Sequence, residues 1–163
     1  MPLPFVRPRR DIPSALPDGE AEEFLEGWCH LFAGALNRLT GWPVVVLRDP
    51  NPPFVSDAYS HAHFLVEAPD GLLWDAAGGA TPQTVLAFYP WIRGARFERV
   101  GDEAAIRGNP HFGATLRAYH DGFLPEVEAI AGRGILPLLR ERYPSPGDGH
   151  GTGEIPENGF RMR

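Results

Sequence analysis

The chain has 163 residues, of which 43% are hydrophobic and 22% are charged, and its formal net charge is −6. This length suffices for one domain that buries its core without disulfides, and the composition is ordinary for a soluble globular protein. The negative balance argues against nucleic acid as a partner, because phosphate binding needs clustered cations.

Cysteine usage and the N-terminus bound the cellular setting. The single cysteine, Cys29, permits no internal disulfide, so no oxidising compartment is required. The N-terminus lacks the apolar core of a signal peptide, and no run approaches the roughly 20 apolar residues of a membrane span. We therefore expect a cytoplasmic protein that does not bind membranes, with signal-independent secretion as an effector left open. Nothing in the sequence favours one oligomeric state over another.

The distribution of proline and glycine divides the chain into three parts. Residues 1–18 contain five prolines and no periodicity, so we expect an irregular N-terminal arm. Residues 144–163 are rich in Gly, Pro and charge, which predicts a flexible C-terminal tail. A single domain is expected between them, over residues 19–143.

Two helices open this domain. The first runs from Glu20 to Gly27 and carries a polar face of glutamates. The second starts near Trp28 and is capped at its C-terminus by Gly41. Its apolar side chains follow the i, i+3, i+4, i+7 pattern of a buried stripe: Phe32, Ala35, Leu36 and Leu39.

Strands follow the helices. A β-branched run predicts a buried strand over residues 44–47, and residues 48–60 are expected to form a loop. Apolar runs at 62–68 and 72–76 flank a Pro-Asp-Gly turn, which predicts an antiparallel hairpin with a three-residue connection.

The turn fixes the register of this hairpin. It places Ala68 opposite Leu72 and Leu65 opposite Asp75. His63 then lies on the same face as Asp75, whereas a slip of one residue would put the two on opposite faces. The turn chemistry therefore decides whether a histidine and a carboxylate meet.

The remaining elements are predicted from local signals. Thr81-Pro82 suits the start of a short helix that ends near Phe88. Residues 95–100 are expected to form a strand and residues 102–107 one helical turn. Residues 112–143 have a helical pattern interrupted by glycines and a proline, which predicts three short helices.

Three residues have types and positions that suit nucleophilic catalysis. Cys29 stands at a helix N-terminus, where unpaired amides and a partial positive charge favour the thiolate. His63 could take the thiol proton and return it to a leaving group. Asp75, on the next strand, could hold the imidazole in the required tautomer.

The residues around these positions resemble a known superfamily. The matching pattern is Gly27-x-Cys29-(x)2-Phe32-Ala33-(x)2-Leu36 followed by His63-(x)6-Asp70-Gly71-(x)3-Asp75-Ala76-x-Gly78. It resembles the papain-like and transglutaminase-like cysteine hydrolases and transferases, in particular small bacterial and phage members, over about a third of the chain.

The resemblance implies an α+β, papain-like fold, in which an N-terminal helix with Cys29 packs on a small antiparallel sheet and further helices follow. It also implies acyl transfer through a thioester: hydrolysis of a peptide or isopeptide amide, glutamine deamidation, or transfer to an amine. The substrate would be a peptide or protein with an amide group, and no cofactor is needed. One departure concerns the oxyanion donor. Papain has a glutamine six residues before its cysteine, and Glu23 stands there in this chain.

Alternatives remain open beside this interpretation. His61 is a rival to His63 as the base, and Trp28 and His61 are the candidate substrate-binding residues. His61 and His63 with Asp75 and Cys29 also have the ligand types of a zinc site, although no metal-binding motif accompanies them. A non-catalytic binding module with the same fold is a third reading, since a lone cysteine on an apolar helix is often core filler.

Overall fold

The computed structural model describes residues 4–51, 61–108 and 114–144, with only the backbone described for residues 61 and 114–120. The elements in chain order are β1 (Ile12–Pro13), α1 (Asp18–Leu25), α2 (Cys29–Thr40), β2 (Val44–Arg48), β3 (His61–Glu67), β4 (Leu73–Asp75), β5 (Gly78–Ala80), α3 (Pro82–Ala87), β6 (Arg96–Gly101), α4 (Glu103–Arg107), α5 (Ala114–Gly134) and α6 (Leu136–Arg142).

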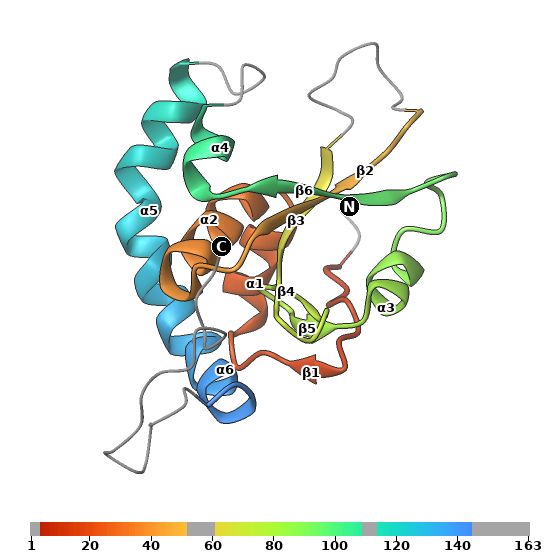
Figure 1. Cartoon of the computed structure of the whole chain (residues 1–163), viewed down its shortest axis with the longest axis horizontal. Helices are drawn as coiled ribbons and strands as arrows, with labels where there is room; N and C mark the ends of the chain where they lie inside the picture. The colour runs from red at the N-terminus through yellow and green to blue at the C-terminus, as the bar shows by residue number, and fades with distance from the viewer. Residues whose placement is uncertain (1–3, 52–60, 109–113, 145–163) are drawn as a thin grey trace.

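One sheet organises these elements. Its six strands are antiparallel and lie in the order β1-β5-β4-β3-β2-β6. Figure 1 shows α1, α2 and α5 together on one side of the sheet and α3 apart from them. The chain is therefore an α+β protein with a small antiparallel sheet, as expected from its sequence.

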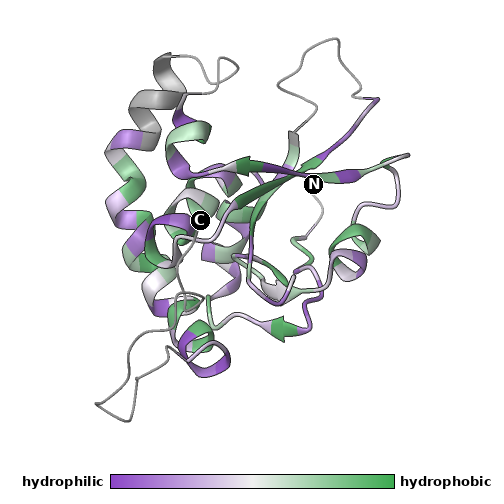
Figure 2. Cartoon of the chain, in the orientation of Figure 1, coloured by the Kyte–Doolittle hydropathy of each residue, from purple (hydrophilic) through white to green (hydrophobic). Residues whose placement is uncertain are grey.

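The two faces of the sheet carry separate hydrophobic clusters. The larger one lies between the sheet and the helices, and it includes Phe32 and Leu36 of α2 with Phe64 and Val66 of β3. The smaller one lies on the other face and consists of Val45, Leu65, Leu73, Ala80 and Val85. Figure 2 shows the apolar colour concentrated on β2 and β3, whereas α5 alternates between polar and apolar bands. Alternation along β3 thus sends neighbouring side chains into different environments.

Helix α2 forms as the sequence predicted. Every residue from His30 to Asn37 is buried, so this helix is surrounded by protein on most sides. Gly41 ends it with φ 70°, a left-handed conformation that glycine adopts without steric cost. Helix α2 therefore runs from Cys29, its first residue, to Thr40.

The predicted hairpin register is confirmed. Val66 pairs with Trp74 and Glu67 with Leu73, and Ala68 N–H donates to the carbonyl of Leu72 at 2.9 Å. The turn glycine, at position 71, has φ 87°. The two strands therefore present His63 and Asp75 on one face.

The N-terminal arm is irregular apart from β1, and it is tied to the sheet. Ile12 and Pro13 pair with Gly79 and Gly78, at the edge of the sheet. Gly78 has φ 128°, and a Cβ atom there would lie 2.0 Å from the carbonyl oxygen of Ile12. The prediction of an irregular arm missed this strand, and the prediction of the domain missed β5, because a Gly-Gly-Ala segment has no strand propensity.

The prediction of three short helices between residues 112 and 143 is wrong. The described residues from 114 onward form only two helices there, since α5 continues through Gly122 and Pro125 to Gly134. Pro125 is exposed, whereas Leu124 and Val127 beside it are buried in the larger cluster. Packing of this apolar stripe against α2 thus outweighs the unfavourable helix propensity of proline and glycine.

The other local predictions agree with the structure. Helix α3 is capped by Thr81, whose hydroxyl accepts the N–H of Thr84 at 3.2 Å. Strand β6 and helix α4 lie where residues 95–100 and 102–107 predict them. Most of the expected loop at 48–60 and nearly all of the expected C-terminal tail lie outside the described residues. Among the described residues, no helix is both long and apolar enough to cross a bilayer.

Candidate active site

The structure brings the three predicted catalytic residues together. His63 Nε2 lies 2.7 Å from Asp75 Oδ2, and both side chains are buried. Cys29 is the first residue of α2, is half-buried and takes part in no disulfide. His63 and Cys29 interact closely enough that each shifts the pKa of the other.

The Cys29 sulfur lies at the part of the β3 edge that β4 does not pair with. Glu67 N–H points toward β2, where it donates to Pro43, and Ala68 N–H points toward β4. By alternation, Phe64 N–H also points to the β4 side. Strand β4 ends at Asp75 and does not extend opposite this amide, which instead donates to the Cys29 sulfur. The N-terminus of α2 therefore occupies the edge position that β4 leaves free.

The environment of Cys29 favours the thiolate. Burial alone would raise the pKa of the Cys29 thiol, but the hydrogen bond and charge of His63 and the backbone amides of Phe64 and His30 together lower it, so the net shift is downward. A thiolate at a helix N-terminus beside an imidazole is the nucleophilic form of cysteine.

The imidazole is correspondingly held as a cation. Burial by itself lowers the pKa of His63, yet hydrogen bonds to Asp75 and to Cys29 raise it to about 9. Nε2 is committed to Asp75, and Nδ1 is buried without a hydrogen-bond partner in the described part of the chain. Nδ1 is therefore the ring nitrogen available to the sulfur.

Arg10 completes the buried network, a role that no pattern in the sequence indicates. Its Nη2 lies 2.6 Å from Asp75 Oδ2 and its Nε lies 3.2 Å from Oδ1, while the N–H of Ala77 donates to Oδ1 at 2.9 Å. Burial would raise the pKa of Asp75, but the charge of Arg10 and the hydrogen bond from His63 hold it well below its usual range. Asp75 is thus a fixed, ionised carboxylate.

Tyr89 is a second residue that sequence reasoning missed. Its ring centroid lies 6.0 Å from that of His63, with the two planes tilted by 32°. Burial raises the pKa of Tyr89, and the negative charges of Asp75 and Cys29 raise it further. The ring of Tyr89 therefore lies beside the buried imidazole of His63, at one side of the site. The only sequence signal was its place just after the predicted helix 81–88.

The predicted substrate-binding residues have different outcomes. Trp28 is half-buried and lines a cavity of about 210 Å³ between α1, α2 and α5, together with Glu23 and Phe123. The backbone of His61 belongs to β3, but its side chain lies outside the described part of the structure. Glu23 thus faces this cavity on an exposed part of α1.

An oxyanion donor is available at the helix N-terminus. The first intrahelical hydrogen bonds of α2 run from Leu31 and Phe32 to the carbonyl of Trp28, at 3.1 and 3.2 Å. The N–H of Cys29 precedes these bonds, so helix geometry leaves it without an intrahelical acceptor. It can donate to an oxygen that develops negative charge beside the sulfur.

The residues present are poorly suited to zinc. Among the described side chains, no group of three or more His, Cys, Asp and Glu residues is arranged to hold a metal ion. Both oxygens of Asp75 are bound by the Arg10 guanidinium. A metal ligand at this position would have to displace a buried ion pair.

Comparisons with known proteins add no assignment. The chain matches no protein-family model, and neither curated proteins nor solved structures give a significant match. The functional argument therefore depends on the chemistry of the site.

Proposed function

We propose that this protein is a thiol-dependent acyl-transfer enzyme that acts on the amide of a peptide or protein. The observation that carries the proposal is the buried chain of contacts from Arg10 through Asp75 to His63, which ends at the half-buried Cys29. An ion-pair network on the surface would be weak evidence for function. Burying three charged groups costs free energy, and such buried networks are common at functional sites.

In the proposed reaction the Cys29 thiolate attacks the amide carbon. A C–S bond forms, and the carbonyl oxygen becomes an oxyanion that the N–H of Cys29 stabilises. His63 then gives the Nδ1 proton to the amide nitrogen as the C–N bond breaks, releasing ammonia or an amine and leaving a thioester. Water or a second amine attacks the thioester carbon and gives its proton to His63, and the C–S bond then breaks, which releases the carboxylic acid or the new amide and regenerates the thiolate.

Asp75 and Arg10 act through His63. Asp75 fixes the ring so that Nδ1 faces the sulfur, and it stabilises the imidazolium without accepting its proton. Arg10 holds the carboxylate in place with two hydrogen bonds, which makes it a positioning residue. These roles support a papain-like or transglutaminase-like assignment, with peptidase, amidase, isopeptidase and glutamine deamidase as the candidate activities.

Alkylation of Cys29 tests the proposal. The rate with iodoacetamide at pH 6.5 should exceed that of an unperturbed thiol at least tenfold, because a thiol with pKa near 8.5 is only about 1% thiolate there. His63→Ala should remove this excess, while Phe123→Ala, on α5, should retain it. If wild type and His63→Ala react equally slowly, Cys29 is not activated and the binding-module interpretation is favoured. Mass spectrometry of the labelled protein identifies the modified residue.

A further inference from the structure

Three aromatic side chains follow α3 and form a cluster of mutual ring contacts, which we call the aromatic cluster: Phe88, Tyr89 and Trp91. The ring centroids of Phe88 and Tyr89 are 5.4 Å apart, those of Tyr89 and Trp91 5.5 Å, and those of Phe88 and Trp91 6.4 Å. All three pairs meet nearly edge to face, an arrangement that the ring quadrupoles favour. The cluster is therefore a packed unit.

The cluster is continuous with the candidate active site. Tyr89 belongs to both, since its ring lies 6.0 Å from His63 on one side and 5.5 Å from Trp91 on the other. Trp91 is thus two ring contacts away from the imidazole. An extended peptide advances about 3.4 Å per residue, so a side chain one to three residues from the reacting amide could reach Trp91.

Trp91 is exposed in a position that the backbone holds in place. It is 67% exposed, although Ile92 beside it is buried. Consecutive turns order the segment, since Tyr89 N–H donates to Leu86 at 2.9 Å and Ile92 N–H donates to Tyr89 at 3.1 Å. A large indole presented to solvent on an ordered turn next to a reactive site has the features of a binding surface, where rigid aromatic rings give contact area at low entropic cost.

We propose that the aromatic cluster binds an aromatic or large aliphatic side chain of a peptide substrate, next to the amide that reacts at Cys29. This inference rests on the proposed function and adds its substrate class. The cluster offers ring faces and a single hydroxyl, that of Tyr89, which suits an uncharged apolar side chain.

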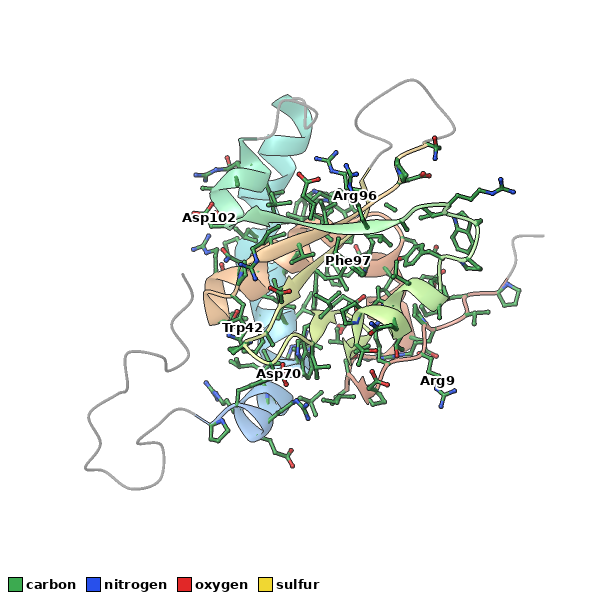
Figure 3. The ribbon with its side chains drawn as sticks, turned by 45° about the vertical axis from the view of Figure 1, so that its right-hand side comes forward. Arg9, Trp42, Asp70, Arg96, Phe97 and Asp102 are labelled. Carbon is green, nitrogen blue, oxygen red and sulfur yellow. The ribbon has the colours of Figure 1, made fainter. Side chains whose placement is uncertain are left out.

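The surroundings of Phe88 favour a peptide over a small apolar molecule. Phe88 also lines a cavity of about 500 Å³ between the N-terminal arm and α3, whose other lining residues are Arg9, Asp11, Gln83, Thr84 and Ala87. Figure 3 shows Arg9 on the arm, extending outward beside α3. This polar cavity can accommodate the backbone and polar side chains of a chain that continues past the aromatic cluster.

Matched electrophiles test the inference. The probes are acetyl-Xaa-Gly chloromethyl ketones with Phe, Leu, Gly or Asp at Xaa, which alkylate the thiolate with loss of chloride. We expect the Phe and Leu probes to label wild-type Cys29 about tenfold faster than the Gly probe, from partial burial of one apolar side chain. Trp91→Ala should bring this ratio close to one, and Trp91→Phe should keep most of it. Iodoacetamide, which has no side chain, should react equally with all three proteins.

Val6→Ala is the control, because Val6 is also an exposed apolar residue, at 68%, but lies in the N-terminal arm outside the cluster. It should leave the Phe-to-Gly ratio unchanged. An unchanged ratio in Trp91→Ala, a faster reaction with the Asp probe, or protection of Cys29 by an N-acetylglucosamine oligomer would each overturn the inference. The proposed function fails separately, through slow iodoacetamide labelling of wild type that His63→Ala does not change.

Discussion

Arg10 and Asp75 form a buried, two-point ion pair although 65 positions separate them in the sequence, with Nη2–Oδ2 at 2.6 Å and Nε–Oδ1 at 3.2 Å. The carboxylate oxygen that receives Nη2 also receives Nε2 of His63. The charge of Asp75 is thus shared between a permanent cation and a titratable one. The pair links the N-terminal arm to the candidate active site, so stability and reactivity should respond together when it is changed.

Replacing Arg10 by methionine should destabilise the protein strongly. The change leaves the Asp75 carboxylate buried with only His63 as a cationic partner, and breaking a buried pair on one side costs about 3–5 kcal/mol. Arg99→Met is the control, since Arg99 pairs with Glu67 at an exposed site and should change the unfolding free energy by less than about 1 kcal/mol. Urea denaturation measures both values. Equal changes in the unfolding free energy would mean that the buried Arg10–Asp75 pair stabilises the protein no more than the exposed Arg99–Glu67 pair.

The unfolding free energy should depend on pH on both sides of a maximum near pH 5–6. Asp75 has a depressed pKa, so its contribution is present above the unfolded value near 3.9 and is lost as the pH falls toward the folded value. His63 has a pKa raised to about 9, so its contribution is complete below about 6.5 and is lost as the pH rises through about 9.

Between these two values His63 binds one more proton in the folded state than in the unfolded state, whereas Cys29, whose pKa is lowered by folding, binds fewer. Because Cys29 offsets part of the His63 contribution, stability should fall by less than about 1.4 kcal/mol per pH unit between pH 6.5 and 9. His63→Gln should flatten that alkaline slope. Denaturation series at several pH values give the slopes. An alkaline slope that persists in His63→Gln would contradict this assignment.

The local parts of the fold were predictable from sequence, and so was half of the site. The turn at 69–71 sets the hairpin register through the conformations of proline and glycine, so the meeting of His63 and Asp75 followed from neighbouring residues. The cap at Gly41 likewise set the C-terminal end of α2. Predictions of this kind succeed because a few adjacent residues decide the geometry.

The missed features depend on contacts that are distant in sequence. Arg10 lies in an arm without periodicity, and only its buried partner reveals its role. Strand β5 forms although Gly78 and Gly79 have low strand propensity. Only glycine fits beside Trp74, since a Cβ at Gly79 would lie 2.5 Å from its ring. Here the absence of a side chain permits the packing, and no local pattern records that.

Asp75→Asn should reduce both stability and thiol reactivity, and a double variant should separate the two effects. The single change leaves Arg10 as a buried cation without its carboxylate, which should cost several kcal/mol. It also removes the charge that holds His63 as a cation, so iodoacetamide labelling of Cys29 at pH 6.5 should slow at least tenfold. Asp70→Asn, in the hairpin turn, should leave the labelling rate unchanged.

The double variant Arg10→Met/Asp75→Asn removes the unpaired cation, so it should recover part of the lost stability. It should not recover the labelling rate, because His63 still lacks its carboxylate. Denaturation and labelling rates on the same samples separate these outcomes. Full recovery of labelling in the double variant would mean that Asp75 acts only through the fold.

Gly78→Ala tests whether the arm must dock for the site to work. A Cβ at this position would meet the Ile12 carbonyl oxygen at 2.0 Å, and its φ of 128° is itself strained for alanine. The substitution should separate β1 from β5 and move Arg10, which lies two residues before β1, away from Asp75. We expect a loss of about 2–4 kcal/mol together with slower labelling of Cys29.

Gly71→Ala provides the matched control for this experiment. Its φ of 87° also disfavours alanine, but a Cβ there would meet nothing within 4 Å. It should therefore cost only the conformational penalty of about 1–2 kcal/mol and leave the labelling rate unchanged. The difference between the two variants isolates the contact with Ile12 from backbone strain. If Gly78→Ala lowers stability but labels Cys29 at the wild-type rate, docking of the arm does not control the thiolate, and the positioning role of Arg10 is contradicted.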